Sequence, residues 1–222
     1  MDRLYLLRHP TQEAGTSPDD GYGNSYTENR YIAIRWLKDN IENIEMERIM
    51  SWEIDFLDGI QAIFHCEWMD TLMPPLSSLG DAGIIWIVLS ILLLLFPRTR
   101  RAGVASAFSL ILMLISGNMI LKPLISRMRP FTVNTAVTLL IPPPGDFSFP
   151  SGHTFASFAS STAILRNHKR IGIPALILAV LIAFSRLYLY VHYPTDVLAG
   201  LLLGILAGYL GNLAARKLLP PS

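Results

Sequence analysis

Four long apolar stretches in the second half of the chain constrain its fold more than any other feature. They are Ala82–Phe96, Gly103–Leu121, Ile171–Val191 and Val197–Ala215. Each approaches the roughly 20 residues that an α-helix needs to cross a bilayer. A shorter fifth candidate, Phe155–Leu165, is rich in small residues, which is typical of a helix packed inside a bundle. We therefore predict an all-α, integral-membrane helical bundle of about five to six spans.

The composition agrees with a membrane protein. Hydrophobic residues make up 51% of the 222-residue chain and charged residues only 16%, against roughly a quarter charged in ordinary soluble domains. Disorder, a coiled coil and a nucleic-acid-binding module are therefore poor interpretations. Residues 1–81 hold 15 of the 17 acids, whereas residues 82–222 hold 12 of the 18 bases, an asymmetry that indicates membrane interaction. The single cysteine, Cys66, excludes an internal disulfide and a thiolate zinc cluster.

The part of the chain before residue 81 divides into two. Residues 1–45 are polar and interrupted by Pro and Gly, and we expect a regulatory or stabilising extension without a cleavable signal peptide. Trp52–His65 carries its apolar residues on one broad face, which is typical of a helix lying in the membrane interface. Trp68–Leu79, with its Pro74–Pro75 pair, is predicted as a second interfacial helix. The predicted organisation is an extension at 1–45, interfacial amphipathic helices at 46–80 and a transmembrane core at 81–217.

The last apolar stretch carries glycines at every fourth position, Gly200, Gly204 and Gly208. A face of small residues lets a neighbouring helix approach closely in lipid. The alternative is that glycine is simply frequent in membrane helices.

The loops between the apolar stretches differ in charge. The loops on one side hold eight bases and no acid, namely Arg98, Arg100, Arg101, Arg166, Lys169, Arg170, Arg216 and Lys217. The positive-inside rule assigns this side to the cytoplasm. The segments Lys122–Pro150 and Tyr190–Tyr193 are then predicted to face outward.

A first cluster of polar residues on that side contains Lys122 and Arg129. Their separation is two helical turns, so both would share one face if the preceding helix continued, and Pro130 would end that helix. Bases at the end of a span also extend to lipid head groups. Three bases on the non-cytoplasmic side run against the positive-inside rule, so head-group contact is the less favoured explanation. The third base, Arg127, receives no role from the sequence.

A second cluster is the segment Phe149–His153, which opens a helical stretch. Ser151 is a natural N-cap, and the amides that follow it form a ready anion site at the positive end of the helix dipole. Gly152 and His153 would lie in the first turn of this helix.

A third cluster runs from Ser185 to Asp196. Arg186 lies inside an apolar span, and a charge in that position is a functional candidate. Pro194 suits the first position of a helix, which places Asp196 in its first turn. His192 precedes Asp196 by four residues, and a carboxylate that fixes one imidazole nitrogen leaves the other free to attack.

Together, the three clusters resemble the three-part signature of the type 2 phosphatidic acid phosphatase superfamily. The signature reads Lys-x6-Arg-Pro, Pro-Ser-Gly-His and Ser-Arg-x5-His-x3-Asp. It is matched at every specified position by Lys122, Arg129, Pro130, Pro150–His153, Ser185, Arg186, His192 and Asp196. The resemblance extends over roughly residues 50–215, and the spacing is similar to that of the small bacterial members.

This resemblance implies a role for each matched residue. His192 would be the nucleophile that forms a phosphohistidine, Asp196 would orient it, and His153 would protonate the leaving oxygen. Five residues would hold the phosphoryl oxygens, namely Lys122, Arg129, Ser151, Gly152 and Arg186. Phosphoryl transfer needs mainly positioning and cationic stabilisation, so we expect no cofactor and no metal.

The resemblance also implies a substrate class. We expect a lipid phosphatase in the bacterial inner (plasma) membrane, with its site facing outward and no nucleic-acid partner. Undecaprenyl diphosphate is the favoured substrate, and phosphatidylglycerophosphate or phosphatidic acid are alternatives. A lipid-binding or transport bundle without turnover is more remote, because binding alone needs no nucleophile. A vanadium haloperoxidase is disfavoured by the five apolar stretches, because that fold is soluble.

Overall fold

The computed structural model describes residues 51–219, and every regular element in this range is helical. A first helix occupies residues 51–64. It is followed by α2 (Glu67–Ser78), a 3-10 turn (Asp81–Gly83), α3 (Ile84–Leu95), α4 (Arg100–Met113), a π-helical segment (Leu114–Leu121), α5 (Lys122–Ile125), α6 (Pro130–Val133), α7 (Gly152–Asn167), α8 (Lys169–Tyr188) and α9 (Pro194–Leu218). The predicted all-α bundle is confirmed. The predicted extension at 1–45 and the start of the 46–80 segment lie outside the described residues.

Three helical segments between residues 51 and 219 are long and apolar enough to cross a membrane. They are Arg100–Val133, Lys169–Tyr188 and Pro194–Leu218. A fourth span results if α2 and the segment Asp81–Leu95, which are bent by 45° relative to each other, count as one. The predicted number of five to six spans stays a prediction.

Helix α7, the predicted fifth span, is the most enclosed element of the bundle. It packs against α4, α8 and α9, and most of its small side chains are buried. The glycines of α9 allow its backbone to approach that of α7 closely. A Cβ atom on Gly204 would lie 2.9 Å from the carbonyl oxygen of Phe155, and one on Gly208 would lie 2.8 Å from that of Ala159. Close packing of the glycine face, as predicted, replaces the hydrophobic effect as the source of helix association in lipid.

Buried hydroxyl groups link α3, α4 and α7 across their interfaces. Ser90 donates to Ser106 at 2.7 Å, and the hydroxyls of Ser106 and Ser160 lie 2.6 Å apart. The indole nitrogen of Trp86 donates to Ser157 at 3.0 Å. Hydrogen bonds of this kind between membrane helices contribute about 0.6 kcal/mol each, so these contacts fix helix register more than they add stability.

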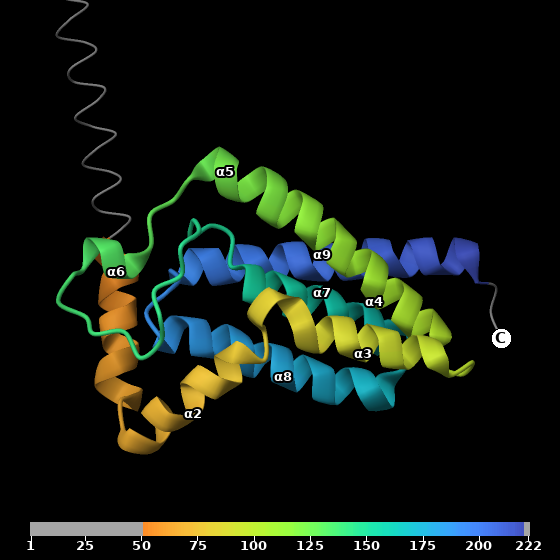
Figure 1. Cartoon of the computed structure of the whole chain (residues 1–222), viewed down its shortest axis with the longest axis horizontal. Coiled ribbons are helices and arrows are strands. Elements are labelled where there is room, and N and C mark those ends of the chain that lie inside the picture. Colours follow the sequence, from red (N-terminus) through yellow and green to blue (C-terminus); the bar gives the residue numbers. More distant parts are fainter. Residues whose placement is uncertain (1–50, 220–222) are drawn as a thin grey trace, which may run out of the picture. The chain divides into compact units, whose positions relative to one another are not determined.

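The two ends of the bundle differ in their charges (Figure 1). The turn from α3 to α4, the turn from α7 to α8 and the end of α9 lie at one end, and they hold the eight loop bases. The beginnings of α7 and α9 and the end of α8 lie at the other end, together with α6. The three clusters of signature residues therefore meet at the end opposite to the basic loops.

One predicted helix boundary in this region is wrong. Lys122 and Arg129 do not share a helical face, because α5 ends at Ile125 and Ser126 adopts a left-handed conformation with φ of 50°. Pro130 does not end a helix either. It begins α6, because a residue without an N–H is suited to the first helical position. The helix therefore ends before Arg129, which reaches the site from the segment between α5 and α6.

The helices before residue 80 pack against the loops of the site end. In the 51–64 helix, Leu57 and Ile60 are buried, whereas Ile63 is 76% exposed. Leu57 packs with Tyr190 and Tyr193, and Ile60 packs with Tyr188 and α2 residues. The predicted apolar face is thus only partly free to meet lipid.

Candidate active site

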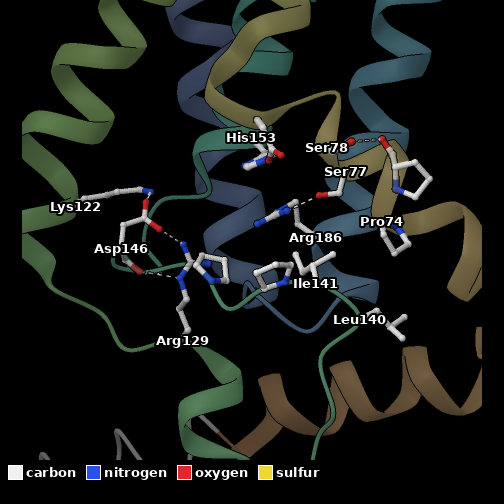
Figure 2. A pocket seen from close by; sticks show the side chains of 14 residues that line it. Pro74, Ser77, Ser78, Lys122, Arg129, Leu140, Ile141, Asp146, His153 and Arg186 are labelled. Atoms are coloured by element: carbon white, nitrogen blue, oxygen red, sulfur yellow. Dashed lines mark hydrogen bonds and ion pairs between the residues drawn. The ribbon is translucent and has the colours of Figure 1, made fainter.

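A cavity of about 560 Å³ opens at the site end of the bundle (Figure 2). Four of the predicted site residues line it, namely Lys122, Arg129, His153 and Arg186. Its rim is formed by prolines and aliphatic residues of α2 and of the loop before α7. A group of cations inside an apolar rim is suited to an anion that carries an apolar substituent.

The carboxylate of Asp146 joins two of these cations. One oxygen accepts from the ammonium of Lys122, and the other lies 2.5 Å from Nη2 of Arg129. Burial alone would raise the pKa of Asp146, but the hydrogen bonds and charges of Lys122 and Arg129 lower it to about 2. The Asp146 side chain is 54% exposed, against 11% for Lys122 and 4% for Arg129. An exposed carboxylate therefore occupies the anion position between two buried cations.

Arg186 is buried inside the end of α8, as predicted, with 2% of its surface exposed. Its Nη1 donates to the hydroxyl of Ser77 on α2. Its Nε has no hydrogen-bond partner within residues 51–219. A buried guanidinium that lines the cavity and has an unpartnered N–H group can bind an anionic ligand.

His153 lies in the first turn of α7, at the edge of the cavity. Its Nε2 is 2.8 Å from a carboxylate oxygen of Asp81, which comes from the turn before α3. This contact orients the imidazole. The sequence analysis did not indicate Asp81 as the acidic partner of His153.

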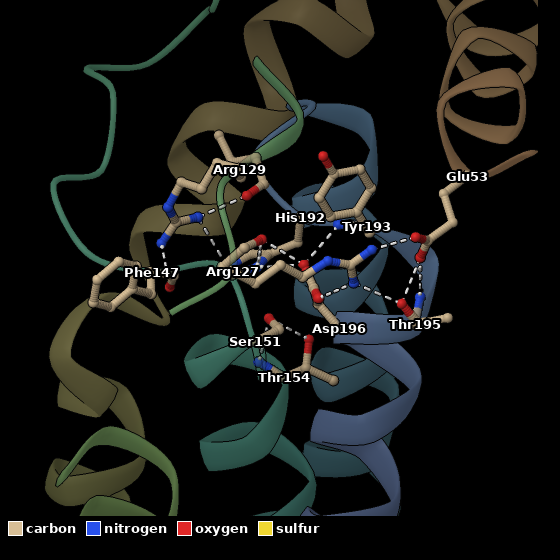
Figure 3. A network of polar contacts seen from close by, with 12 residues as sticks. Glu53, Arg127, Arg129, Phe147, Ser151, Thr154, His192, Tyr193, Thr195 and Asp196 are labelled. Carbon is tan, nitrogen blue, oxygen red and sulfur yellow. Dashed lines mark hydrogen bonds and ion pairs between the residues drawn. The ribbon is translucent and has the colours of Figure 1, made fainter. Parts of the chain in front are cut away.

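His192 and Asp196 do not line this cavity. They belong to a buried polar network that also includes Arg129 (Figure 3). Nδ1 of His192 is 3.5 Å from Oδ2 of Asp196, and the histidine is 1% exposed. The hydroxyl of Ser148 donates to the same oxygen at 2.5 Å and lies 3.4 Å from Nδ1. The carboxylate thus faces one imidazole nitrogen and leaves the other, Nε2, on the opposite side.

Arg129 connects the buried pair to the cavity. It lines the cavity, and its Nη1 lies 3.3 Å from Nε2 of His192. Burial lowers the pKa of His192, and the charges of Arg129 and Arg186 lower it further, to about 3, against the opposing effect of the hydrogen bond that the imidazole donates to Asp196. The imidazole is therefore neutral near pH 7, and its nitrogen that faces Arg129 keeps a lone pair.

The two helix N-termini at the site form as the sequence predicts. Ser151 caps α7, and its hydroxyl accepts from the amide of Thr154 at 3.5 Å. Tyr193 is the N-cap of α9, and Asp196 in the first turn completes a capping box by accepting from the amide of Tyr193 at 2.9 Å. Ser151 is fully buried, and Gly152 lines a second cavity rather than the first. These two predicted phosphate ligands lie beside the cationic cavity, close to His153.

That second cavity has a volume of about 550 Å³ and lies between α3 and α4. Its walls are mainly aliphatic side chains of these two helices, including Ile87, Ile91 and Ile111. At one end it shares Lys122, Asp146 and His153 with the cationic cavity, and it reaches Gly152 there. An apolar groove thus meets the cations at one point.

Several residues at the site were missed by the sequence analysis or, like Arg127, received no role from it. Asp146 and Asp81 pair with the cations and His153, Ser148 contacts Asp196, and Glu53 and Arg127 form ion pairs behind it. Asp146 is one of two acids after residue 81, and this rarity was an available signal. Residues 51–219 contain no group of three His, Cys, Asp or Glu side chains placed to hold a metal ion.

Comparison with known proteins places this site in a family. The model of the PAP2 superfamily matches residues 102–218, which is more than half of the chain and includes every signature residue. The chain belongs to the PAP2 superfamily. It is accordingly a helical membrane phosphatase that acts on a lipid phosphate.

The proteins similar to this PAP2 protein include undecaprenyl-diphosphatases and a phosphatidylglycerolphosphate phosphatase. The undecaprenyl-diphosphatase of Sulfolobus acidocaldarius is 39% identical over 61% of this chain and 66% of that protein. The undecaprenyl-diphosphatase BcrC of Bacillus subtilis is 33% identical over 66% of this chain and 75% of that protein. The crystal structure of a transmembrane PAP2-type phosphatidylglycerolphosphate phosphatase from Bacillus subtilis is similar with a TM-score of 0.64 and 25% identity. That similarity covers 79% of this chain and 90% of the other.

Proposed function

We propose that this PAP2 protein hydrolyses a lipid diphosphate, best matched by undecaprenyl diphosphate, through a phosphohistidine at His192. The observation that carries the proposal is the position of Arg129. It lines the cationic cavity and lies 3.3 Å from Nε2 of His192. A phosphoryl group bound to Arg129 would therefore be next to a neutral, buried nucleophile.

The reaction takes place in two steps. Nε2 of His192 attacks the terminal phosphorus, the bond to the leaving oxygen breaks, and His153 supplies the proton that this oxygen needs. A water molecule then gives its proton to His153 and attacks the phosphohistidine, which releases phosphate and restores His192. Asp196 holds Nδ1 throughout, so that the ring presents Nε2 to the phosphorus.

The cations have their main effect in the transition state. Lys122, Arg129 and Arg186 stabilise the charge that spreads over the equatorial phosphoryl oxygens. The amide of Gly152 and the hydroxyl of Ser151, at the N-terminus of α7, complete the set. Because the Asp146 carboxylate forms ion pairs with Lys122 and Arg129, the phosphate must displace it to bind these two cations.

The apolar groove between α3 and α4 supports a substrate with a long lipid chain. It begins at the cations and is walled by aliphatic residues, so a phosphate in the cavity would have its chain in the groove. The names of the relatives favour undecaprenyl diphosphate. The similar crystal structure makes phosphatidylglycerophosphate the alternative substrate.

Phosphate release by the purified protein tests substrate and mechanism together. We expect the fastest turnover with undecaprenyl diphosphate in a panel that includes phosphatidylglycerophosphate and phosphatidic acid. The activity should persist in excess EDTA and be blocked by vanadate, which mimics pentacoordinate phosphorus. Strict dependence on added Mg²⁺ would contradict the mechanism, and a preference for phosphatidylglycerophosphate would replace the substrate.

We further propose that the site opens at the outer face of a bacterial inner membrane. Support comes from the eight bases at the opposite end of the bundle and the positive-inside rule. In a Cys66→Ser background, single cysteines at the exposed positions Thr135 and Pro97 test this in intact cells. A membrane-impermeant thiol reagent should label position 135 and spare position 97, and the reverse pattern would invert the orientation.

A further inference from the structure

Arg127 lies outside the specified positions of the signature, and the mechanism above gives it no role. It nevertheless makes several polar contacts at the site end. Its Nη1 donates to Oδ1 of Asp196 at 2.6 Å and to the hydroxyl of Thr195 at 2.8 Å. Its Nη2 forms an ion pair with Glu53. It does not line either cavity described above. Arg127 is thus directed at the carboxylate of Asp196 (Figure 3) and not into the cationic cavity.

The two oxygens of Asp196 have separate partners. Oδ2 is the oxygen on the His192 side, where it also accepts from Ser148 and from the amide of Tyr193. Oδ1 receives Nη1 of Arg127. A carboxylate held at both oxygens cannot rotate about its Cβ–Cγ bond, so Arg127 fixes the direction in which Oδ2 meets the imidazole.

Arg127 is in turn fixed by Glu53 from the 51–64 helix. Glu53 is fully buried, and its other oxygen accepts from the amide of Thr195 at 3.2 Å and from the Thr195 hydroxyl. The guanidinium also lies over the ring of Tyr193, 3.9 Å from the ring centre. A buried carboxylate without a partner is strongly unfavourable, so Glu53 and Arg127 hold each other in place.

The charges of this cluster suit the nucleophilic step. Glu53 and Asp196 carry two negative charges and Arg127 one positive charge, which leaves one net negative charge behind His192. When Nε2 attacks phosphorus, positive charge develops on the imidazole ring. The net negative charge stabilises that ring, and Arg127 keeps the carboxylate in position to do so.

We propose that Arg127 and Glu53 are positioning residues for Asp196, and that the 51–64 helix is therefore a part of the active site. The proposal rests on the proposed role of His192 as nucleophile. Both residues act through Asp196 and do not touch the phosphate. Their loss should therefore lower kcat and leave KM unchanged.

The test compares purified variants at enzyme concentrations that make slow rates measurable. We expect Arg127→Ala to lower kcat about 10- to 100-fold, by analogy with the loss of a partner that orients a metal-ligating side chain, with KM within about two-fold. Arg127→Lys should recover part of kcat because it keeps the charge but not the two-pronged geometry. Glu53→Gln should lower kcat less than Arg127→Ala. Arg166→Ala is the matched control, because Arg166 lies over the ring of Tyr209 in the same way, at 3.8 Å, on the C-terminal part of α7.

A double-mutant cycle separates positioning from general structure. In an Asp196→Asn background, Arg127→Ala should change kcat less than two-fold, because the group through which it acts is already altered. An equal, multiplicative loss in both backgrounds, or a loss confined to KM, would overturn the proposal. If Arg127→Ala does not fold, the same cycle with Arg127→Lys decides, and wild-type kcat in the lysine variant would also overturn it.

His192→Ala is measured in the same series. A normal rate in His192→Ala would refute the proposed nucleophile. Loss of activity in His192→Ala with normal Arg127 variants would refute only the positioning role.

Discussion

The two acid–base clusters at the site end differ in the exposure of their acids. In the cationic cavity, Asp146 and Asp81 are 54% and 61% exposed at their side chains. Behind it, Asp196 and Glu53 are fully buried. Both clusters contain ion pairs at similar distances, but an exposed carboxylate is easily resolvated by water, whereas a buried one is not.

This difference in exposure indicates two different roles for the acids. An acid that can leave its partners makes room for a phosphate, so the pairs in the cavity are exchangeable. An acid that cannot leave keeps a nucleophile oriented through every turnover, so the pairs behind His192 are permanent. The account therefore expects substitutions in the cavity to change KM, with kcat changing as well where a cation is lost. Substitutions in the buried cluster should change kcat alone.

The largest effect is expected for His192→Ala. The account assigns the acceptance of the phosphoryl group to His192 alone, so kcat should fall by more than about 1000-fold, as for the loss of other nucleophiles. Phosphate release from the lipid substrate measures this. A variant with wild-type rate would remove the buried cluster from the mechanism altogether.

The next largest effect is expected for Lys122→Ala in the cavity. Loss of one preorganised donor to a developing oxyanion lowers kcat about 100- to 1000-fold, and KM should rise as well because the ground-state phosphate is also bound. Steady-state kinetics over a range of lipid concentrations separates the two constants. A loss in kcat with unchanged KM would place Lys122 functionally with the buried cluster.

A smaller effect of opposite sign is expected for Asp146→Asn. The neutral amide competes less with phosphate for Lys122 and Arg129, so KM should fall a few-fold with little change in kcat. Because the pKa of Asp146 is lowered to about 2, its carboxylate stays ionised even at a pH below the ordinary pKa of an aspartate. The difference between the variant and the wild type should therefore be constant from about pH 5 to pH 8. A rise in KM would show that Asp146 supports the cavity instead of competing in it.

The smallest effect is expected for removal of residues 1–45. Every residue of both clusters lies at or beyond Glu53, so activity on a short-chain substrate should stay within a few-fold of the full chain. Extending the deletion through Glu53 should cost far more, because Arg127 then loses its buried partner. Equal activity of the two truncated proteins would contradict the role of the 51–64 helix.

The sequence predicted those parts of the site that depend on local signals. Ser151 and Pro194 mark helix starts, and the four-residue spacing of His192 and Asp196 indicated that they pair. Arg186 stands out as a charge in an apolar span. Lys122 and Arg129 were identified correctly as neighbours, but by a wrong route. No local signal indicated the left-handed Ser126 that ends α5.

The acidic partners could not be predicted because they are brought together by tertiary packing. Asp81 meets His153, and Glu53 meets Arg127, over 72 and 74 positions of sequence. Glu53 did carry a weak signal, because it lies on the same stripe of its helix as the buried Leu57 and Ile60. An acid on a buried stripe needs a basic partner, but its identity depends on the fold.

The central claim is that the phosphoryl group is transferred to His192, and trapping of the phosphoenzyme tests it most directly. Labelled lipid diphosphate is mixed with excess enzyme, turnover is stopped within milliseconds at alkaline pH, and the peptides are examined by mass spectrometry. The account predicts one phosphoryl group on the peptide that contains His192, its accumulation in His153→Ala, which activates water poorly, and its absence in His192→Ala. Label on another residue, or rapid turnover with no labelled protein at any time, would contradict the account.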